Sequence, residues 1–471
     1  MNDSVTAAIA ANRFGLGARP GELDAAAADP RGWLGAQLRA AAPLIEDVAL
    51  QPSDAIVRIA LALRAQRRER KQQSAPESTA AAGDAAAQAF AKLPQLYRPI
   101  YVSEVSARVR SAVASERSFV ERLVQFWTNH FAVSVDKIAV LGLAGSLERE
   151  AIRPNVLRGF SDLLLAVEQH PAMLVYLDNH VSIGPHSAAA ARAAHARIER
   201  KLGINENLAR EILELHTLGV NGGYTQSDVT TFAQVITGWS IGGNGRLASG
   251  EPGRFVFRPE FHEPGAKTVL GKRYAEDGLQ EGQRVLRDLA TRAASARFIA
   301  TKLARHFIAD KPPLAAVDRL ARVFLDTRGD LPSVYRALIE LPQSWEQPLA
   351  KFKTPQDYVY SSFRALELPL DSGPRALVAF ELLGQRTYSP GSPAGWPDRS
   401  ADWDGSSAVL HRIEWADAVG QRVGDQRSAA QLAPRLLGGT LSAATRTSIA
   451  RAASSAQALT LLLAAPEFMR R

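Results

Sequence analysis

The sequence contains no cysteine among its 471 residues. This absence excludes disulfide bonds, zinc–thiolate sites, iron–sulfur clusters and cysteine nucleophiles. Any metal ion, such as a divalent cation, would be held by histidine, carboxylate, amide or backbone oxygen ligands. No stretch approaches the roughly 20 apolar residues that a transmembrane helix needs.

Several catalytic and targeting motifs are also absent. The chain has no His-Glu-x-x-His zinc helix and no Gly-x-Ser-x-Gly nucleophile elbow. Residues 1–11 lack both the basic start and the apolar run of a secretory signal peptide. As written, the chain is expected in the cytoplasm. The periplasm or cell envelope is the alternative if the chain is trimmed or is exported with a partner.

The charge balance is basic, with a formal net charge of +8. One dense basic run covers residues 64–71, and the other arginines are scattered. We interpret the run as a solvated helix end, because no nucleic-acid recognition module accompanies it.

Hydrophobic periodicity predicts helices along most of the chain. Alternation typical of strands occurs only at 254–258 and 267–270. We therefore predict a mainly α fold, a multi-helix globular bundle with a small β-hairpin near residues 254–272. Residues 1–471 are expected to form one large domain, with a flexible insertion at about 72–92 and a mobile loop at about 182–202. Thr225 followed by Asp228 predicts a capping box at the start of a helix.

The most informative stretch is 205–219, which is predicted to be a helix ending at Gly219. At about 100° per residue, one stripe of this helix carries Asn207, Arg210, Glu211 and Glu214. Such a polar cluster is typical of a site held inside a helical core. His216 lies roughly 140° away from Glu211, so we interpret it as a core histidine.

Three further regions carry candidate site residues. His130 shares an apolar helical stripe with Phe126 and Trp127, which directs its ring inward. It is either a core histidine whose ring is satisfied by a backbone carbonyl or a carboxylate, or part of a site. His262 and Glu263 are predicted on the loop between the two strands. The third region is 384–407, a long irregular segment rich in Gly, Pro and Trp, which is usually either functional or packed as an Ω-like loop. Separately, the helical stretch 302–307 is amphipathic.

Together these motifs resemble the bacterial domain-of-unknown-function family 1800, in order and over nearly the whole chain. The signature motifs are Phe-Trp-x-Asn-His-Phe within 121–131 and Asn-Glu-Asn followed by Leu-His-Thr-Leu-Gly within 205–220. Other matching positions are 12–15, 171–178, 223–225, 237–239, 305–307, 395–397, His262 and Lys267. The resemblance implies a mainly helical fold and no established reaction. Relatives often occur beside genes for an exported, sulfatase-like family, which implies a paired role at the envelope. Many relatives show Asp where this chain has Glu263, which argues against a strict ligand role there.

Two interpretations of the polar residues remain open. In the first, the chain is an enzyme with a hydrolytic, metal-dependent or metal-free site inside the helical core. Its catalytic candidates are Glu211, Glu214, His130 and His262, of which Glu211, Glu214 and His262 are also the candidate metal ligands. Its candidates for substrate binding are Asn207, Arg210, Lys267, Trp239 and Trp396. Paired carboxylates suit metal binding or acid–base catalysis, and histidine adds a base near neutral pH.

In the second interpretation, the protein is a non-enzymatic scaffold or binding protein that acts with a sulfatase-like partner. Arg210 would then neutralise Glu211 or Glu214 in a buried salt-bridge network. Replacing Glu211 by alanine separates the two interpretations, because breaking a buried pair costs about 3–5 kcal/mol.

Overall fold

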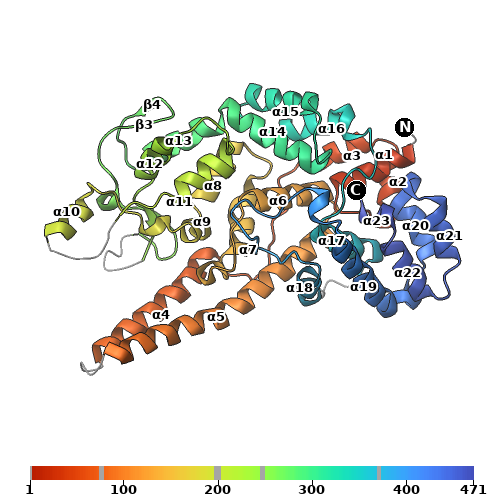
Figure 1. Ribbon diagram of the computed structural model, residues 1–471, viewed down its shortest axis with the longest axis horizontal. Helices are drawn as coiled ribbons and strands as arrows, with labels where there is room; N and C mark the ends of the chain where they lie inside the picture. Colours follow the sequence, from red (N-terminus) through yellow and green to blue (C-terminus); the bar gives the residue numbers. More distant parts are fainter. Residues whose placement is uncertain (1–2, 74–78, 196–202, 244–249, 369–372) are drawn as a thin grey trace.

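The computed structural model describes residues 3–73, 79–195, 203–243, 250–368 and 373–471 (Figure 1). The mainly α prediction is confirmed. In chain order, the helices of the first half are α1 (Asp3–Ile9), α2 (Glu22–Ala27), α3 (Pro30–Gln37), α4 (Ser53–Gln73), α5 (Thr79–Ala114), α6 (Ser118–His130), α7 (Ala144–Leu147), α8 (Phe160–Glu168), α9 (Pro171–Tyr176), α10 (Ala188–His195), α11 (Asn207–Glu211) and α12 (Gln226–Val235).

The second half begins with four short strands and continues as helices. The strands are β1 (Trp239–Ile241), β2 (Phe255–Phe257), β3 (Lys267–Val269) and β4 (Lys272–Tyr274). The helices are α13 (Leu279–Ala290), α14 (Ala293–Phe307), α15 (Leu314–Asp326), α16 (Leu331–Glu340), α17 (Pro355–Leu366), α18 (Gly373–Leu382), α19 (Ser406–Val423), α20 (Ala429–Leu437), α21 (Ala443–Ala450), α22 (Ser455–Leu463) and α23 (Pro466–Met469). None of the helices in the described part of the chain is both long and apolar enough for a membrane crossing.

The helix containing residues 205–219 is not regular. After α11 the chain continues as a π-helical turn over Ile212–Thr217 and ends at Gly219, which has a φ of 85°. Two more π-helical turns lie at Ala10–Phe14 and Glu148–Ile152. Because a π turn shifts the helical register, side chains beyond residue 211 do not follow the regular 100° spacing that the sequence-based stripe assumed.

The two predicted strands exist, but they do not pair with each other. The strand β2 pairs antiparallel with β1, and β3 pairs antiparallel with β4. A turn at Leu270 and Gly271, both with positive φ, joins β3 to β4. Tight turns of this kind favour pairing between neighbours in sequence, so two separate hairpin-like ribbons form instead of one.

The helices α4 and α5 form a long antiparallel hairpin that extends away from the body of the protein (Figure 1). The region 72–92, which was expected to be a flexible insertion, falls around the tip of this hairpin. Residues 72–73 and 79–92 are helical, and 74–78 lie outside the described residues. The alanine-rich run after residue 79 has high helix propensity, which explains this difference. In the predicted loop 182–202, residues 188–195 form α10 and 196–202 lie outside the described residues.

The helix α6 runs through the middle of the molecule and is held there by buried charges (Figure 1). Arg153 makes two hydrogen bonds to the carboxylate of Glu121 on α6, each 2.8 Å long. Arg153 also contacts Glu148 at 3.2 Å, and Glu148 binds Arg108 of α5 at 2.6 Å. All four side chains are almost fully buried. Removing one partner of such a network costs about 3–5 kcal/mol. The network therefore holds α6 firmly against α5.

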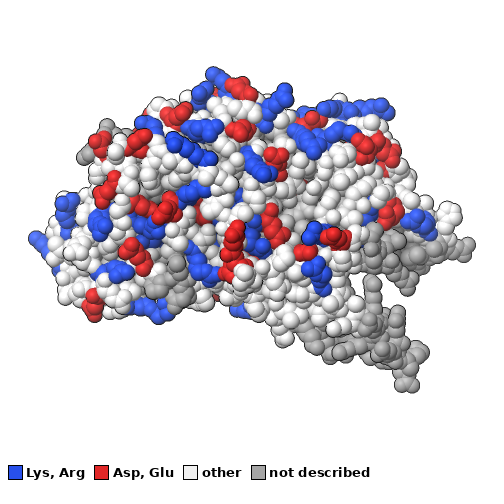
Figure 2. Space-filling view, turned by 180° about the vertical axis from the view of Figure 1, so that it is seen from behind, with Lys and Arg blue, Asp and Glu red and all other residues white. Residues whose placement is uncertain are grey.

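The predicted capping box is confirmed at the start of α12. Thr225 accepts from the backbone N–H of Asp228, and Asp228 accepts from the backbone N–H of Thr225. On the surface, basic and acidic side chains are interspersed across the face that Figure 2 shows. The excess positive charge of the sequence is therefore spread among opposite charges on this face.

Candidate functional site

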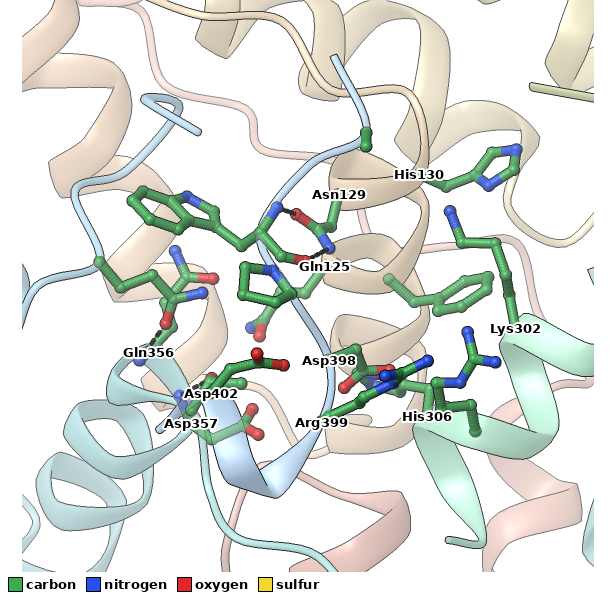
Figure 3. Close-up of a pocket in the computed structure, with 17 residues that line it drawn as sticks. Gln125, Asn129, His130, Lys302, His306, Gln356, Asp357, Asp398, Arg399 and Asp402 are labelled. Carbon is green, nitrogen blue, oxygen red and sulfur yellow. Dashed lines mark hydrogen bonds and ion pairs between the residues drawn. The ribbon is translucent and has the colours of Figure 1, made fainter. Parts of the chain in front are cut away.

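A polar cavity of about 370 Å³ lies beside the C-terminal half of α6. Its walls come from α6, from α14, from the start of α17 and from the 383–405 segment between α18 and α19 (Figure 3). This volume is within the range of pockets that bind small molecules. The four walls come from distant parts of the sequence, so only the folded chain forms the cavity.

Two histidines line this cavity, and each has one ring nitrogen fixed by a hydrogen bond. His130 Nε2 lies 3.1 Å from the carbonyl oxygen of His216, and His306 Nδ1 lies 3.0 Å from Oδ2 of Asp398. The other two nitrogens, His130 Nδ1 and His306 Nε2, are buried and have no hydrogen-bond partner among the described residues. Buried polar atoms without partners are rare in folded proteins and call for an explanation.

Both imidazoles are neutral at neutral pH. Burial, with the nearby positive charge of Lys302, lowers the pKa of His130 well below its usual range. Burial also lowers the pKa of His306, and Asp398 opposes this effect without outweighing it. A carbonyl or carboxylate oxygen only accepts hydrogen bonds, so the proton of each neutral ring is on the fixed nitrogen. The unpartnered nitrogens therefore carry lone pairs and can accept protons.

Three cations line the cavity without an ion pair to any described carboxylate. Lys302 and Arg305 come from α14, and Arg399 comes from the 383–405 segment. In Figure 3 the ammonium group of Lys302 points toward the ring of His130. Burial lowers the pKa of Lys302 to about 8, with an opposing effect of Asp398. The amine thus stays mainly protonated at neutral pH but is costly to keep charged there.

The buried carboxylates of the cavity are neutralised by cations behind its wall. Asp357 contacts Arg122 at 2.9 Å and Arg471 at 3.0 Å. Asp398 contacts His306, and its backbone oxygen accepts from Lys351. Burial alone would raise the pKa values of Asp357 and Asp398. Arg122 and Arg471 outweigh this effect at Asp357, and the hydrogen bond from His306 together with Lys351 and Arg471 outweighs it at Asp398, so both pKa values lie well below the usual range. Both carboxylates are therefore ionised, and both already have partners within the protein.

Two of the nine residues predicted from the sequence, His130 and Trp396, line this cavity. The backbone of Trp396 is hydrogen-bonded to Asn129 on α6. The predicted loop segment 384–407 therefore does contribute a wall, and α6 anchors it.

The predicted polar stripe lies elsewhere, on α11 and the turn after it. Asn207 is exposed, whereas Glu211 and Glu214 are half-buried and form no ion pair with any residue in the described ranges. Arg210 binds Glu206 at 3.1 Å and Gln226 at 2.9 Å instead. Thus Arg210 does not neutralise Glu211 or Glu214 in a buried network. Burial, with the charges of Glu214 and Glu168, raises the pKa of Glu211 against the opposing effect of His216.

The remaining predicted residues pack in a third region. His262 is buried, with Nδ1 3.1 Å from the carbonyl oxygen of Thr237 and Nε2 3.3 Å from the carboxylate of Glu281. Lys267 also binds Glu281, at 3.2 Å. Trp239 is fully buried in the hydrophobic core, where its ring contacts Phe255. Trp239 therefore has no exposed surface that could contact a substrate.

The predicted metal-binding group of Glu211, Glu214 and His262 is not assembled. The described part of the chain has no cluster of three or more histidine or carboxylate side chains that could hold a metal ion. The reason is that Glu281 and Thr237 occupy both ring nitrogens of His262. His216 is buried, as predicted, and its Nδ1 lies 2.8 Å from Glu168.

Sequence reasoning missed Lys302, Arg305, His306 and Asp398. The first three share the amphipathic stretch 302–307, whose cluster of basic residues was a signal. Asp398 follows the Trp-Pro pair of the irregular segment, and nothing in the sequence relates it to His306, which is 92 residues away.

The fold and cavity together define a mainly helical protein with a polar, histidine-containing pocket. Residues 9–470 match a family described as a protein of unknown function, DUF1800, and the chain belongs to this family. No curated protein and no solved structure matches the chain.

Proposed function

We propose that the chain is an enzyme, that the cavity between α6, α14 and the 383–405 segment is its active site, and that it catalyses hydrolysis by general acid–base chemistry. The observation that supports this proposal best is the pair of neutral histidines. Each has one nitrogen fixed by a partner and a second nitrogen without one in the described structure. A fixed orientation and a free lone pair are requirements for a general base. Neither nitrogen has accessible surface in this structure, so proton transfer requires a small movement that opens it to the cavity.

His306 is the better candidate for the base. When it accepts a proton from a water molecule at Nε2, the imidazolium that forms lies 3.0 Å from the carboxylate of Asp398. A buried carboxylate in this position fixes the tautomer and stabilises the imidazolium. The pKa of His130, in contrast, is lowered further by the charge of Lys302. We assign His130 a positioning role, with its free Nδ1 accepting a hydrogen bond from the substrate.

The test uses variants that preserve the structural hydrogen bonds. In His306→Asn the amide N–H can replace Nδ1–H toward Asp398, while the base is lost. In His130→Gln the longer amide can replace Nε2–H toward the His216 carbonyl. His411→Asn on α19 is the matched control, since His411 does not line the cavity.

Hydrolysis of nitrophenyl phosphate, sulfate, acetate and glycoside substrates would be measured for each protein. We expect turnover of at least one class, with kcat reduced about 100-fold or more in His306→Asn and KM changed little. Equal activity in His306→Asn and His411→Asn would contradict the proposal. So would a panel without any turnover combined with early unfolding of His306→Asn, which would make the histidine structural.

A binding role with a sulfatase-like partner is the alternative that the family resemblance implies. The feature that supports it is the α4–α5 hairpin, which extends away from the body of the protein (Figure 1). Co-purification of the sulfatase-like neighbour with the full chain, and its loss when the hairpin is shortened, would favour this role.

A further inference from the structure

We propose that the cavity binds the phosphate group of a phosphate monoester, held by Lys302 and Arg305 of α14 and by Arg399 of the facing segment. This inference rests on the proposed function, because it names the substrate class of the same site.

The ion-paired charges in and behind the cavity wall balance one another. Arg122, Arg471 and Lys351 supply three cationic side chains there, and Asp357, Asp398 and Asp310 supply three carboxylates. Every one of these groups makes at least one ion pair with another member of the set. This inner set therefore contributes little net charge to the cavity.

The charges that face the cavity do not balance. Lys302, Arg305 and Arg399 line it. Of the carboxylates that line it, Asp402 has no ion pair with any cation in the described structure. Asp402 and Arg399 are exposed, while Lys302 and Arg305 are half-buried. The surplus of positive charge is thus greatest along α14, away from bulk water, where electrostatic interactions are stronger. The surplus of two charges matches a phosphate monoester, which carries a charge near −2 at pH 7.

The geometry of the cations suits a group with several oxygen atoms. Lys302 and Arg305 are three residues apart on α14, so their side chains lie on the same face of the helix. Arg399 approaches from the opposite wall (Figure 3). A guanidinium presents a rigid fork that can bind two phosphate oxygens, and an ammonium adds a point charge. A carboxylate ligand would carry one negative charge and two oxygens, which leaves part of the surplus unmatched.

Unpartnered donors in the wall provide the second observation. Nε of Arg305 and Nε2 of Gln125 are buried and have no hydrogen-bond partner in the described structure. Both residues line the cavity. Each is an N–H donor without accessible surface in this structure, so a bound oxyanion would satisfy it once the side chain turns toward the cavity.

The inference predicts a pH dependence that can be measured. The groups around the Lys302 amine are His130 from α6, Arg305 from α14 and Asp398 from the 383–405 segment. The pKa of Lys302 is about 8, so the amine loses its charge as pH rises through that value. Affinity for phosphate should therefore be highest near pH 7, decline as pH rises above about 8, and decline below about 6, where phosphate becomes a monoanion.

The experiment is calorimetric titration of the full chain with inorganic phosphate at pH 7, with sodium sulfate and sodium acetate as comparison ligands. The variants are Lys302→Met and Arg305→Met, and the matched control is Lys311→Met, an exposed lysine after α14. We expect phosphate to bind more tightly than sulfate or acetate, and each cavity variant to weaken binding about tenfold or more. Lys311→Met should bind like the unchanged protein. Thermal melts of all variants establish that they are folded.

The outcomes separate this inference from the proposed function. Phosphate binding that survives in His306→Asn but is lost in Lys302→Met supports the inference whether or not His306 is catalytic. Undiminished binding in Lys302→Met and Arg305→Met would overturn it, as would tighter binding of acetate than of phosphate. Absence of phosphate binding at millimolar concentration would overturn it too, while histidine-dependent turnover of an uncharged ester would leave the proposed function standing alone.

Discussion

The side-chain amide of Asn129 makes two hydrogen bonds with the backbone of Trp396. Nδ2 donates to the Trp396 carbonyl oxygen at 2.9 Å, and Oδ1 accepts from its N–H at 2.7 Å. The pair joins the last turn of α6 to the middle of the 383–405 segment, across 267 residues of sequence. An irregular segment of this length needs such contacts to keep one conformation, and this one carries Asp398 and Arg399.

We predict that Asn129→Ala loosens this segment. The change removes both hydrogen bonds and leaves the Trp396 N–H and carbonyl without these partners, so the free energy of unfolding should fall by about 1–3 kcal/mol. Limited proteolysis should cut within 383–405 faster than in the unchanged protein. Asn129→Asp keeps the acceptor and loses the donor, and we expect it to lie in between. If urea denaturation and proteolysis of Asn129→Ala match those of the unchanged chain, the anchor has no structural importance.

A second prediction concerns the glycine beside this anchor. Gly395 has a φ of 83°, and a Cβ there would lie 2.2 Å from the carbonyl oxygen of Asn129. Gly395→Ala therefore combines backbone strain with a clash against main chain, and should destabilise the fold by about 2–4 kcal/mol.

Gly391 is the matched control in the same segment. A Cβ at Gly391 would meet nothing within 4 Å. Gly391→Ala should therefore leave the urea midpoint nearly unchanged. Similar midpoints for the two variants would show that the segment does not sit tightly on α6.

The features that sequence predicted well are local ones. Helical periodicity identified α6 and its inward-facing His130, and the Thr225–Asp228 spacing identified a capping box. These depend on residues within one or two turns of a helix, where spacing determines position. The mainly helical fold follows from the same periodicity.

The features that sequence missed depend on distant partners. His306 is held by Asp398, 92 residues later, and His262 by Glu281, 19 residues later. Composition does not indicate which carboxylate reaches which imidazole. The stripe from Asn207 to Glu214 was drawn on a regular α-helix, whereas a π turn begins at Ile212. The predicted group of Glu211, Glu214 and His262 was therefore chosen by residue type alone, without knowledge of where the side chains lie.

A third prediction is the pH dependence of stability that Asp357 provides. Arg122 and Arg471 hold its pKa well below the usual range despite burial. A carboxyl group with a depressed pKa stabilises the fold fully above its unfolded pKa of about 3.9, and this contribution is lost as pH falls below that value. Asp357→Asn should therefore lower stability at pH 7 by about 3–5 kcal/mol, because Arg122 and Arg471 lose their carboxylate.

The same variant should also respond less to acid. Between about pH 4 and pH 2, the stability of Asp357→Asn should fall less steeply than that of the unchanged protein. Denaturation with urea at several pH values measures this slope. Asp425→Asn, at an exposed position, is the control and should show the original slope. Parallel slopes for all three proteins would mean that Asp357 titrates normally in the fold.

The last prediction tests the two interpretations of Glu211. Its pKa is raised, mainly by burial, with Glu214 and Glu168 adding to the effect. A carboxyl group with a raised pKa costs the fold no stability below its unfolded pKa of about 4.3, and its cost grows as pH rises above that value. Glu211→Gln removes the charge and keeps the shape. It should be as stable as the unchanged protein at pH 4 and slightly more stable, by about 0.5 kcal/mol, at pH 8.

A buried salt-bridge network predicts the opposite sign, with a loss of about 3–5 kcal/mol. Elemental analysis of the purified protein and of Glu211→Gln addresses the metal interpretation in the same samples. A stoichiometric metal that is lost in Glu211→Gln would restore Glu211 as a ligand. Equal metal content with increased stability at high pH would instead identify Glu211 as an ionisable side chain without an ion-pair partner in the described structure. The cavity of His306 and Lys302 would then be the better candidate for the active site.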